Sequence, residues 1–322
     1  MQAIVQRTYG SADVLGLAEI DKPEIATNEV LVKVHAAGLD RGTWHLMTGL
    51  PYLVRLAFGF RAPKNPVPGL DVAATVVAIG SDVTRFKAGD EVFGVSRGSF
   101  AEYAAALADK LAPKPASLSF EQAAVVPISA LTALQGLRDA GRIESGQKVL
   151  IVGASGGVGT YAVQLAKAFG AEVTGVCSTA KVDLVRSIGA DHVVDYTRED
   201  FADGVQRYDL ILDIGGNSRL SRLRRALTPT GALVIAGGEE GGKWTGGIDR
   251  QLRALALSLF VPQRMTMFIS KENHADLATL TKFIEAGDVT PVVDKAYPLA
   301  EAPDAMRHLE AGHARGKVVI TM

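Results

Sequence analysis

The sequence is short of cysteine, of excess charge and of long apolar runs, and each shortage excludes a class of protein. Its single cysteine, Cys177, cannot form an intrachain disulfide or a multi-cysteine zinc site. One cysteine also predicts a reducing compartment, which we take to be the cytoplasm. The formal net charge is -1, so no basic surface for nucleic acid is indicated. No uncharged run reaches the length of a membrane span, and residues 1–7 are typical of a strand and not of a secretion signal.

The length of the chain allows two domains. With 322 residues, of which 48% are hydrophobic and 21% charged, each domain has enough apolar side chains for a core. The nearest candidate for a membrane span, from Leu252 to Val261, is interrupted by Arg253 and followed by Pro262. We expect it to form a core or lid helix, and contact with a membrane surface or a partner subunit is the alternative.

The two parts of the chain differ in their pattern. In the first part, short β segments are separated by Gly, Pro, Asn and Asp, which predicts a compact β-barrel. From Gln147 strands alternate with helices, which is typical of a parallel sheet. The first part has expected strands at residues 3–6, 29–37, 71–79, 91–95 and 101–106 and helices at 120–126 and 129–140. The second part has expected strands at 149–152, 172–177, 192–196, 208–214, 232–236 and 265–269, with helices at 160–169, 180–188, 220–227 and 275–286. The tail after Pro291 is expected to form a strand, a helix and a final strand at 317–321.

The most informative segment runs from Lys148 to Gly159. An apolar strand enters a glycine cluster, a helix of small residues leaves it, and Ala154-x-Gly156-x-x-Gly159 matches the G-x-G-x-x-G pattern with one change. Gly156 permits close approach of the backbone to a pyrophosphate, and Gly159 permits the helix to pack on the strand. The N–H groups at the start of the helix would face the phosphates. The segment therefore predicts a dinucleotide site, with a whole domain in front of it.

The end of the second expected strand distinguishes the two nicotinamide cofactors. NAD-binding proteins normally place an acid there to hold the ribose hydroxyls, but here Ser178 ends the strand and Lys181 follows. A hydroxyl and a cation suit a 2′-phosphate, which a carboxylate would repel. Tyr196, at the end of the third strand, is placed to face the adenosine end. We therefore expect NADPH, and the alternative is that Lys181 is a solvated residue in the first turn of a helix.

Several motifs in a fixed order extend this interpretation to nearly the whole chain. They are Pro68-Gly69-Leu70-Asp71, the run from Gly80 to Gly94, the run from Ser129 to Ala133, the glycine segment from Gly153 to Gly159, the run from Ser187 to Asp191, and the closing run from Gly316 to Ile320. In this order they resemble the medium-chain dehydrogenase/reductase superfamily, and specifically its zinc-free quinone oxidoreductase-like branch.

The resemblance implies an α/β fold with two domains. A GroES-like β-barrel substrate domain would comprise residues 1–122 and 296–322. A Rossmann domain with a doubly wound parallel sheet, residues 123–295, would be inserted into it, with the active site in the cleft. The resemblance also implies a homodimer formed through the Rossmann domain.

The same resemblance assigns residues to each part of the cofactor. The residues expected near the pyrophosphate are Ser155, Gly156, Gly157 and Val158. Those expected near the nicotinamide are Thr132, Phe268 and Ile269, with Gly237 at the cofactor edge. Those expected near the 2′-phosphate are Ser178, Lys181 and Tyr196.

The chain departs from zinc-dependent relatives at their metal ligands. Those proteins carry a cysteine in the region where this chain has Leu39-Asp40, and a Gly-His-Glu motif in the region where this chain has Gly69-Leu70-Asp71. The cysteine-rich structural zinc lobe is absent as well. We therefore expect no metal. Assembly of His35, His45, Asp40 and Asp71 into an unusual site is the alternative, although no ligand spacing supports it.

The lack of these ligands bears on the reaction. An alcohol or a simple carbonyl is harder to polarise without a Lewis acid. A quinone or an α,β-unsaturated carbonyl accepts hydride to give a delocalised anion, which hydrogen bonds can hold and water or a side chain can protonate. The sequence thus predicts a zinc-independent, NADPH-dependent oxidoreductase that acts on a small hydrophobic quinone or conjugated carbonyl compound. The alternatives are an NADP-dependent alcohol dehydrogenase or carbonyl reductase, and an NADPH-binding sensor or assembly protein without catalysis.

The segment around Asp40 leaves two interpretations open. Zinc-free relatives often carry Asn at this position, and a carboxylate cannot donate as an amide does unless it is protonated. In one interpretation Asp40, Arg41 or His45 supplies polarity or a proton to the substrate. In the other, Arg41 pairs with Asp40, Trp44 belongs to the core and His45 is at the surface. The apolar residues 50–58 form either a hydrophobic substrate mouth or a packed loop or helix.

Overall fold

The computed structural model describes residues 1–322 except 217 and 239–241. The chain divides into two compact units, the first made of residues 1–131, 272–286 and 291–322, the second of residues 132–271 and 287–290. The sequence places the boundaries at 122/123 and 295/296. In the structure the first division falls between residues 131 and 132, inside helix α4 (Pro127–Gln135). Helix α10 (His274–Glu285) packs on β7 (Leu111–Pro113) and therefore belongs to the first unit.

The first unit is built on a seven-stranded sheet in the order β14-β15-β3-β4-β5-β7, with β6 paired to β3. Its pairs are antiparallel except for β14 with β15, and β1 and β2 form a separate two-stranded sheet. The strands predicted for this part are present, and β2 and β7 are additional. The strand bounds are β1 Gln2–Gln6, β2 Leu15–Glu19, β3 Glu29–Leu39, β4 Asp71–Ile79, β5 Glu91–Val95, β6 Tyr103–Leu107, β14 Val293–Pro298 and β15 Lys317–Thr321.

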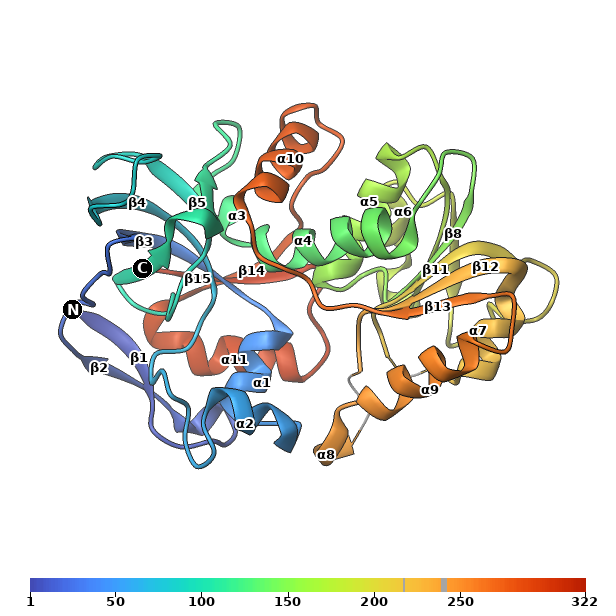
Figure 1. Ribbon diagram of the computed structural model, residues 1–322, viewed down its shortest axis with the longest axis horizontal. Coiled ribbons are helices and arrows are strands. Elements are labelled where there is room, and N and C mark those ends of the chain that lie inside the picture. The colour runs from blue at the N-terminus through green and yellow to red at the C-terminus, as the bar shows by residue number, and fades with distance from the viewer. Residues whose placement is uncertain (217, 239–241) are drawn as a thin grey trace. The chain divides into compact units, whose positions relative to one another are not determined.

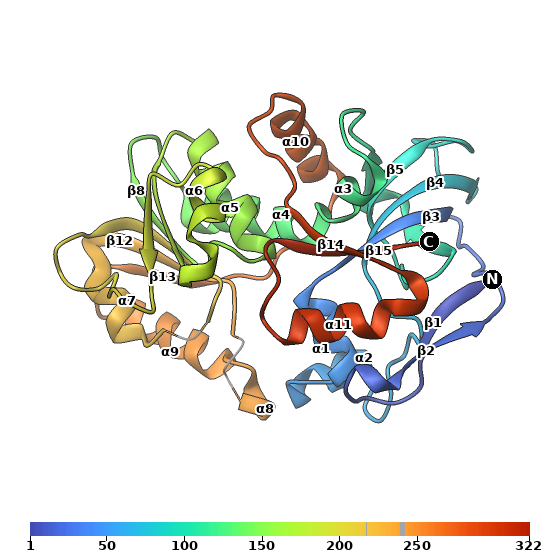
Figure 2. The ribbon, with the colours of Figure 1, turned by 180° about the vertical axis from the view of Figure 1, so that it is seen from behind.

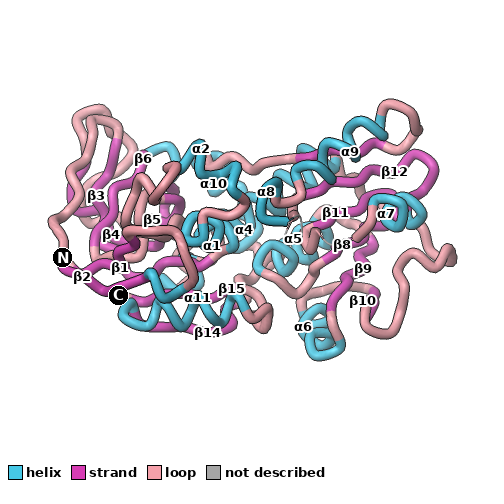
Figure 3. Tube along the Cα trace, turned by 90° about the horizontal axis from the view of Figure 1, so that it is seen from below, coloured by secondary structure: helices cyan, strands magenta, loops and turns pink. Residues whose placement is uncertain are grey.

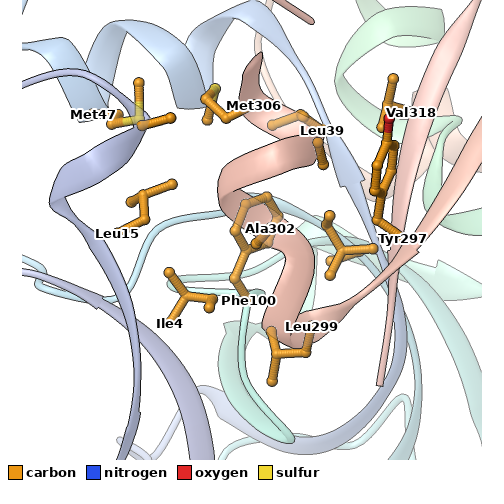
Figure 4. Packing of buried hydrophobic residues seen from close by; sticks show 14 of the residues in the cluster. Ile4, Leu15, Leu39, Met47, Phe100, Tyr297, Leu299, Ala302, Met306 and Val318 are labelled. Atoms are coloured by element: carbon orange, nitrogen blue, oxygen red, sulfur yellow. The ribbon is translucent and has the colours of Figure 1, made fainter. Parts of the chain in front are cut away.

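A buried apolar cluster holds the helices of the first unit in place. Ile4 of β1, Leu39 of β3, Met47 of α1 (Arg41–Thr48) and Met306 of α11 (Ala302–Glu310) belong to it, and Figure 4 shows these side chains converging. Helix α11 contacts β14 and β15, and Figure 2 shows it lying along them. This unit also contains the helices α2 Arg55–Phe58 and α3 Phe120–Ala124. The cluster thereby fixes α1, which carries two of the predicted catalytic residues and is preceded by the third.

The second unit is a doubly wound parallel sheet in the order β10-β9-β8-β11-β12-β13. Figure 3 shows β12, β11, β8, β9 and β10 following one another in this order, and Figure 1 shows α5 and α6 on one face and α7 and α9 on the other. The strands are β8 Lys148–Val152, β9 Glu172–Cys177, β10 His192–Asp195, β11 Tyr208–Asp213, β12 Leu227–Ile235 and β13 Arg264–Met267. The helices are α5 Gly157–Ala168, α6 Val182–Ser187, α7 Leu220–Ala226, α8 Gly242–Thr245 and α9 Ile248–Ser258. The predicted α/β fold class is confirmed.

Helix α9 contains most of the apolar run that the sequence singles out. Ala254 packs in the core of the second unit, whereas Leu252 is exposed, as are Leu259 and Phe260 after the end of the helix. Within the described part of the chain, no helix combines the length and the apolar character needed to cross a bilayer. One face of α9 therefore serves the core, and the other faces outward.

Candidate functional site

The glycine segment forms a tight turn between β8 and α5. Gly153 has φ 91°, and its carbonyl oxygen accepts from the N–H of Gly156 at 3.2 Å. Gly156 caps α5 with no side chain to hydrogen-bond the first turn, so the N–H groups of that turn are left for a ligand. A Cβ on Gly159 would collide with the Gly153 carbonyl oxygen. The turn thus has the shape that the sequence predicts for a pyrophosphate cradle around Ser155, Gly156, Gly157 and Val158.

Two further loops lie beside this turn at the carboxyl edge of the sheet. The N–H groups of Ile214 and Gly215, which follow β11, both donate to the carbonyl of Val152 at the end of β8. A Cβ on Gly237, which follows β12, would collide with the carbonyl oxygen of Ile214. The strand order reverses between β8 and β11, and ligands of such sheets bind at that edge. The close backbone packing fits a dinucleotide.

A buried ion pair at the same edge was not predicted. Asp213 ends β11, and its carboxylate accepts from the guanidinium of Arg250 on α9 and from the N–H of Gly216. Burial raises the pKa of Asp213, and Arg250 opposes that shift. Arg250 also donates to the carbonyl of Ser218 at 3.0 Å. The pair therefore ties α9 to the loop that touches the glycine turn. The feature of the sequence that could have indicated this ion pair is the acid, Asp213, at the end of an apolar strand.

The three residues predicted for the 2′-phosphate lie on neighbouring turns. Ser178 follows β9, Tyr196 follows β10, and Asp195 pairs with Cys177 in the parallel register of these strands. The N–H of Tyr196 donates to the carbonyl of Cys177 at 3.1 Å, and that of Lys181 donates to the carbonyl of Ser178 at 2.9 Å. Tyr196 is 58% exposed. The structure thus brings these three positions together.

The residues predicted for the nicotinamide are linked by a second set of contacts. Thr132 of α4 donates through its hydroxyl to Ser270 at 3.0 Å. Gln135 of α4 both accepts from and donates to the backbone of Lys271. The segment of Phe268 and Ile269, which follows β13, is therefore anchored to α4. Ile269 is 79% exposed.

In the first unit, Asp40 is buried and caps α1. Its Oδ1 atom accepts from the N–H of Thr43 at 2.7 Å. Its Oδ2 atom and the hydroxyl of Thr43 are buried and have no hydrogen-bond partner among the residues described. Buried polar atoms are normally paired, so this site suits a polar group from a ligand or from water.

The neighbours of Asp40 on α1 follow neither sequence interpretation completely. The Arg41 guanidinium lies 5.2 Å from the ring centre of Trp44. Trp44 is half-buried: one part packs against the apolar cluster, and its ring N–H donates to Glu310 at 2.7 Å, so it meets the predicted core position only in part. His45 is half-buried, and its Nδ1 atom lies 2.7 Å from the carbonyl oxygen of Leu50. A carbonyl can only accept, so Nδ1 carries the hydrogen and the orientation of the ring is fixed.

Asp71 forms a buried ion pair that sequence analysis missed. Its Oδ2 atom lies 3.0 Å from the Nζ atom of Lys317, and its Oδ1 atom accepts from the N–H of Ile128 near the start of α4. Burial raises the pKa of Asp71 to about 7, Lys317 opposes the rise and the charge of Asp40 adds to it. Because Lys317 is paired with Asp71, this acid is a structural tie between β4, β15 and α4.

The alternative metal site does not form. His35 contacts the hydroxyl of Thr75 and stacks on Phe120. Across the described ranges, no three His, Cys, Asp or Glu side chains gather in the way a metal ion needs.

Residues 52–58 are a short 3-10 helix followed by α2, and Leu53, Leu56 and Phe58 on them are exposed. These apolar side chains are not a packed helix face.

Comparisons with known proteins agree with this geometry. A family model described as an alcohol dehydrogenase GroES-like domain matches residues 26–116, and one described as a zinc-binding dehydrogenase matches residues 188–320. Two solved structures are similar over 100% of this chain. The quinone oxidoreductase of Coxiella burnetii has a TM-score of 0.88, 29% identity and 99% coverage of that chain. The Escherichia coli quinone oxidoreductase complexed with NADPH has a TM-score of 0.85, 28% identity and 100% coverage.

Two plant proteins are more similar in sequence. The 2-methylene-furan-3-one reductase of Solanum lycopersicum is 36% identical, over 99% of this chain and 79% of that protein. The chloroplastic NADPH-dependent alkenal/one oxidoreductase of Arabidopsis thaliana is 37% identical over the same shares. The chain therefore belongs to the medium-chain dehydrogenase/reductase superfamily, in its zinc-free, quinone oxidoreductase-like branch.

Proposed function

We propose that this protein is an NADPH-dependent reductase that transfers a hydride to a quinone or an α,β-unsaturated carbonyl compound without a catalytic metal. One contrast carries the proposal. The second unit has the dinucleotide edge of the family, with Ser178, Lys181 and Tyr196 on adjacent turns. The first unit has Asp40 and Asp71 where zinc-dependent relatives keep their ligands, and Asp71 is paired with Lys317.

The cofactor assignment rests on the chemistry of the 2′-phosphate end. No acid ends β9, where an NAD-binding protein holds its ribose hydroxyls. Lys181 and the hydroxyls of Ser178 and Tyr196 would hold the 2′-phosphate through charge-assisted hydrogen bonds. The turn after β8 would hold the pyrophosphate, and Thr132 with residues 268–269 would border the nicotinamide. When bound, NADPH supplies the hydride.

The substrate assignment rests on what a conjugated acceptor requires. Adding a hydride to one end of the conjugated system leaves a delocalised negative charge on the carbonyl oxygen. Hydrogen bonds can hold that charge until a proton arrives. Asp40, Arg41 and His45 are our candidates for these tasks, Arg41 as a donor and His45 or Asp40 as a proton carrier. The printed names of the two plant relatives, a furanone reductase and an alkenal/one oxidoreductase, describe acceptors of this kind.

The oligomeric state and the cellular location of the protein stay predictions. We propose a homodimer formed through the second unit, in which β13 is an end strand of the sheet, and light scattering on the purified protein would test it. Cytoplasmic location also stays a prediction, since several relatives are named chloroplastic or mitochondrial.

The experiment is NADPH oxidation across a panel of acceptors, with alcohols and NADP⁺ in parallel. We expect turnover with at least one quinone or enone and none with simple alcohols. Oxidation of alcohols alone would instead support an alcohol dehydrogenase, a name that one similar structure carries. Tight NADPH binding by folded protein, with no turnover on any acceptor, would overturn the enzyme proposal and support a sensor or assembly protein.

A further inference from the structure

An acid stands at the cofactor edge of the second unit that the NADPH proposal does not use. Asp195 is the last residue of β10 and lies in register with Cys177, next to the turn that carries Ser178 and Lys181. A carboxylate at this place is unexpected, since it would repel a 2′-phosphate and could instead hold ribose hydroxyls. What the carboxylate touches therefore decides which cofactor it favours.

Both oxygens of Asp195 are occupied by donors from the two turns. Oδ2 accepts from the Thr179 hydroxyl at 2.5 Å, and Oδ1 accepts from the Thr197 hydroxyl at 2.7 Å and the Thr197 N–H at 3.0 Å. Arg198 adds a cation, with its Nε atom 3.7 Å from Oδ2. The side chain of Asp195 is only 9% exposed. Little of the acid is left to meet a ribose.

The charge of Asp195 is maintained by these contacts. The hydroxyls of Thr179 and Thr197 hold the pKa of Asp195 below its usual value, so the side chain is a carboxylate at neutral pH. The side chain of Arg198 is 73% exposed. A cation beside the carboxylate offsets its repulsion of an anionic ligand.

The contacts also join the two turns into one block. The hydroxyls of Thr179 and Thr197 are 3.0 Å apart, and the Tyr196 N–H bonds the carbonyl of Cys177. Thr179 follows Ser178 directly, and Tyr196 lies between Asp195 and Thr197. Fixing the threonines therefore fixes the residues proposed to meet the phosphate, and preorganised groups bind with a smaller loss of entropy.

We propose that Asp195 is a positioning residue for cofactor selection, which clasps Thr179 and Thr197 so that Ser178, Lys181, Tyr196 and Arg198 converge on the 2′-phosphate. The inference rests on the proposed use of NADPH. The proposal adds Arg198 to the residues expected to bind the phosphate. It also means that Asp195, although it is an acid at the adenosine end of the site, favours NADPH over the less negative NADH.

The substitution Asp195→Asn tests the proposal by the sign of its effect. If Asp195 acts only as a nearby negative charge, removing that charge strengthens NADPH binding. If Asp195 is a clasp, the amide loses one acceptor oxygen, the turns loosen, and NADPH binds more weakly. We expect the dissociation constant for NADPH to rise about tenfold, the loss of roughly one hydrogen bond, while NADH binding changes by less than about twofold.

The measurement is direct titration of NADPH, NADH, 2′,5′-ADP and 5′-AMP by calorimetry, so that no turnover is needed. Thr179→Val should reproduce the effect, and Thr179→Ser, which keeps the hydroxyl, should keep the wild-type ratio. The control is Asp191→Asn at the other end of β10, where the carboxylate bonds Lys167 and the N–H of Val173. We expect that variant to lose thermal stability and to keep the ratio of NADPH to NADH affinity.

The outcomes separate the two proposals. Wild-type protein with no preference for NADPH or for 2′,5′-ADP would overturn the cofactor assignment itself. A wild-type preference that Asp195→Asn leaves unchanged or strengthens would overturn the clasp alone. If Asp195→Asn does not fold, the Thr179→Val and Thr179→Ser pair decides, and equal ratios in these two variants would overturn the clasp.

Discussion

The two units build their candidate sites from different material. In the second unit the candidate cofactor edge consists mainly of backbone, and Gly153, Gly156 and Gly159 would leave space there for phosphates. In the first unit the notable groups are buried side chains, Asp40 with an unpaired oxygen and Asp71 joined to Lys317. The first kind of site depends on local spacing along the chain. The second kind depends on contacts between segments far apart in sequence.

The comparison indicates how substitutions should act. A change at the cofactor edge removes contacts with a ligand and leaves the rest of the unit packed. A change in the buried pair leaves a charge without its partner in a place that water does not reach, which is costly for folding. We therefore expect effects on stability in the first unit and effects on binding in the second.

The largest expected effect is that of Lys317→Met. Above pH 7, where the Asp71 carboxyl is ionised in the pair, this change leaves a buried carboxylate without its cation, and breaking a buried pair in this way costs about 3–5 kcal/mol in the free energy of unfolding. Chemical denaturation would measure it. The double variant Asp71→Asn, Lys317→Met should recover part of the loss, because no charge is then left alone. A loss below about 1 kcal/mol, the range of surface pairs, would contradict the assigned burial of the pair.

Next in size is Lys181→Ala, which acts on binding. Loss of a charge-assisted contact with the 2′-phosphate should weaken NADPH binding by about 1.5–3 kcal/mol, or one to two orders of magnitude. The free energy of unfolding should hardly change, and NADH binding should stay the same. Ser178→Asp should shift the preference toward NADH. Unchanged NADPH affinity in Lys181→Ala would place the phosphate elsewhere.

Asp71 should also make the stability of the first unit depend on pH. The pKa of Asp71 is raised from 3.8 to about 7 by burial, so the folded protein holds a proton that the unfolded chain releases at lower pH. The stabilising contribution of that proton is present below pH 4 and is lost as the pH rises toward 7, with a slope of at most about 1.4 kcal/mol per pH unit. The difference between denaturation curves of the wild type and Asp71→Asn across that range isolates it. A flat difference would contradict the raised pKa.

The smallest effect on stability is expected from Asp40→Asn. Both residues cap helices well, so the free energy of unfolding should change by less than about 0.5 kcal/mol. If Asp40 carries a proton to the substrate, kcat should fall at least about a hundredfold, the lower end of what acid–base groups contribute. Steady-state assays with a quinone and with an enone measure this. Wild-type kcat in the variant would assign Asp40 to the helix cap alone.

The same comparison shows what could be predicted from sequence. The parallel-sheet strands and the glycine turn were predicted because alternating elements and glycine spacing are local signals. The Rossmann-type edge followed from them. The pairs Asp71–Lys317 and Asp213–Arg250 were missed, because their partners are separated by 246 and 37 residues and no local pattern marks them. Asp195 was missed for a related reason, since its meaning depends on the hydroxyls that surround it.

The short elements were the least visible. The strands β2 and β7 carry no strong alternation, and α1 begins at a cap, Asp40, which the sequence suggested as a catalytic group and not as the start of a helix. The resemblance implied a domain boundary after residue 122, whereas the compact units part within α4. These differences arise because tertiary packing, and not local preference, decides where such segments end.

The most direct test of the central claim is the turnover of metal-stripped protein with NADPH and with NADH on one enone acceptor. After treatment with a chelator, we expect kcat/KM with NADPH to be unchanged and to exceed that with NADH by at least about tenfold, the equivalent of 1.4 kcal/mol. Activity that disappears with the chelator and returns with Zn²⁺, or equal kcat/KM values for the two cofactors, would contradict the account.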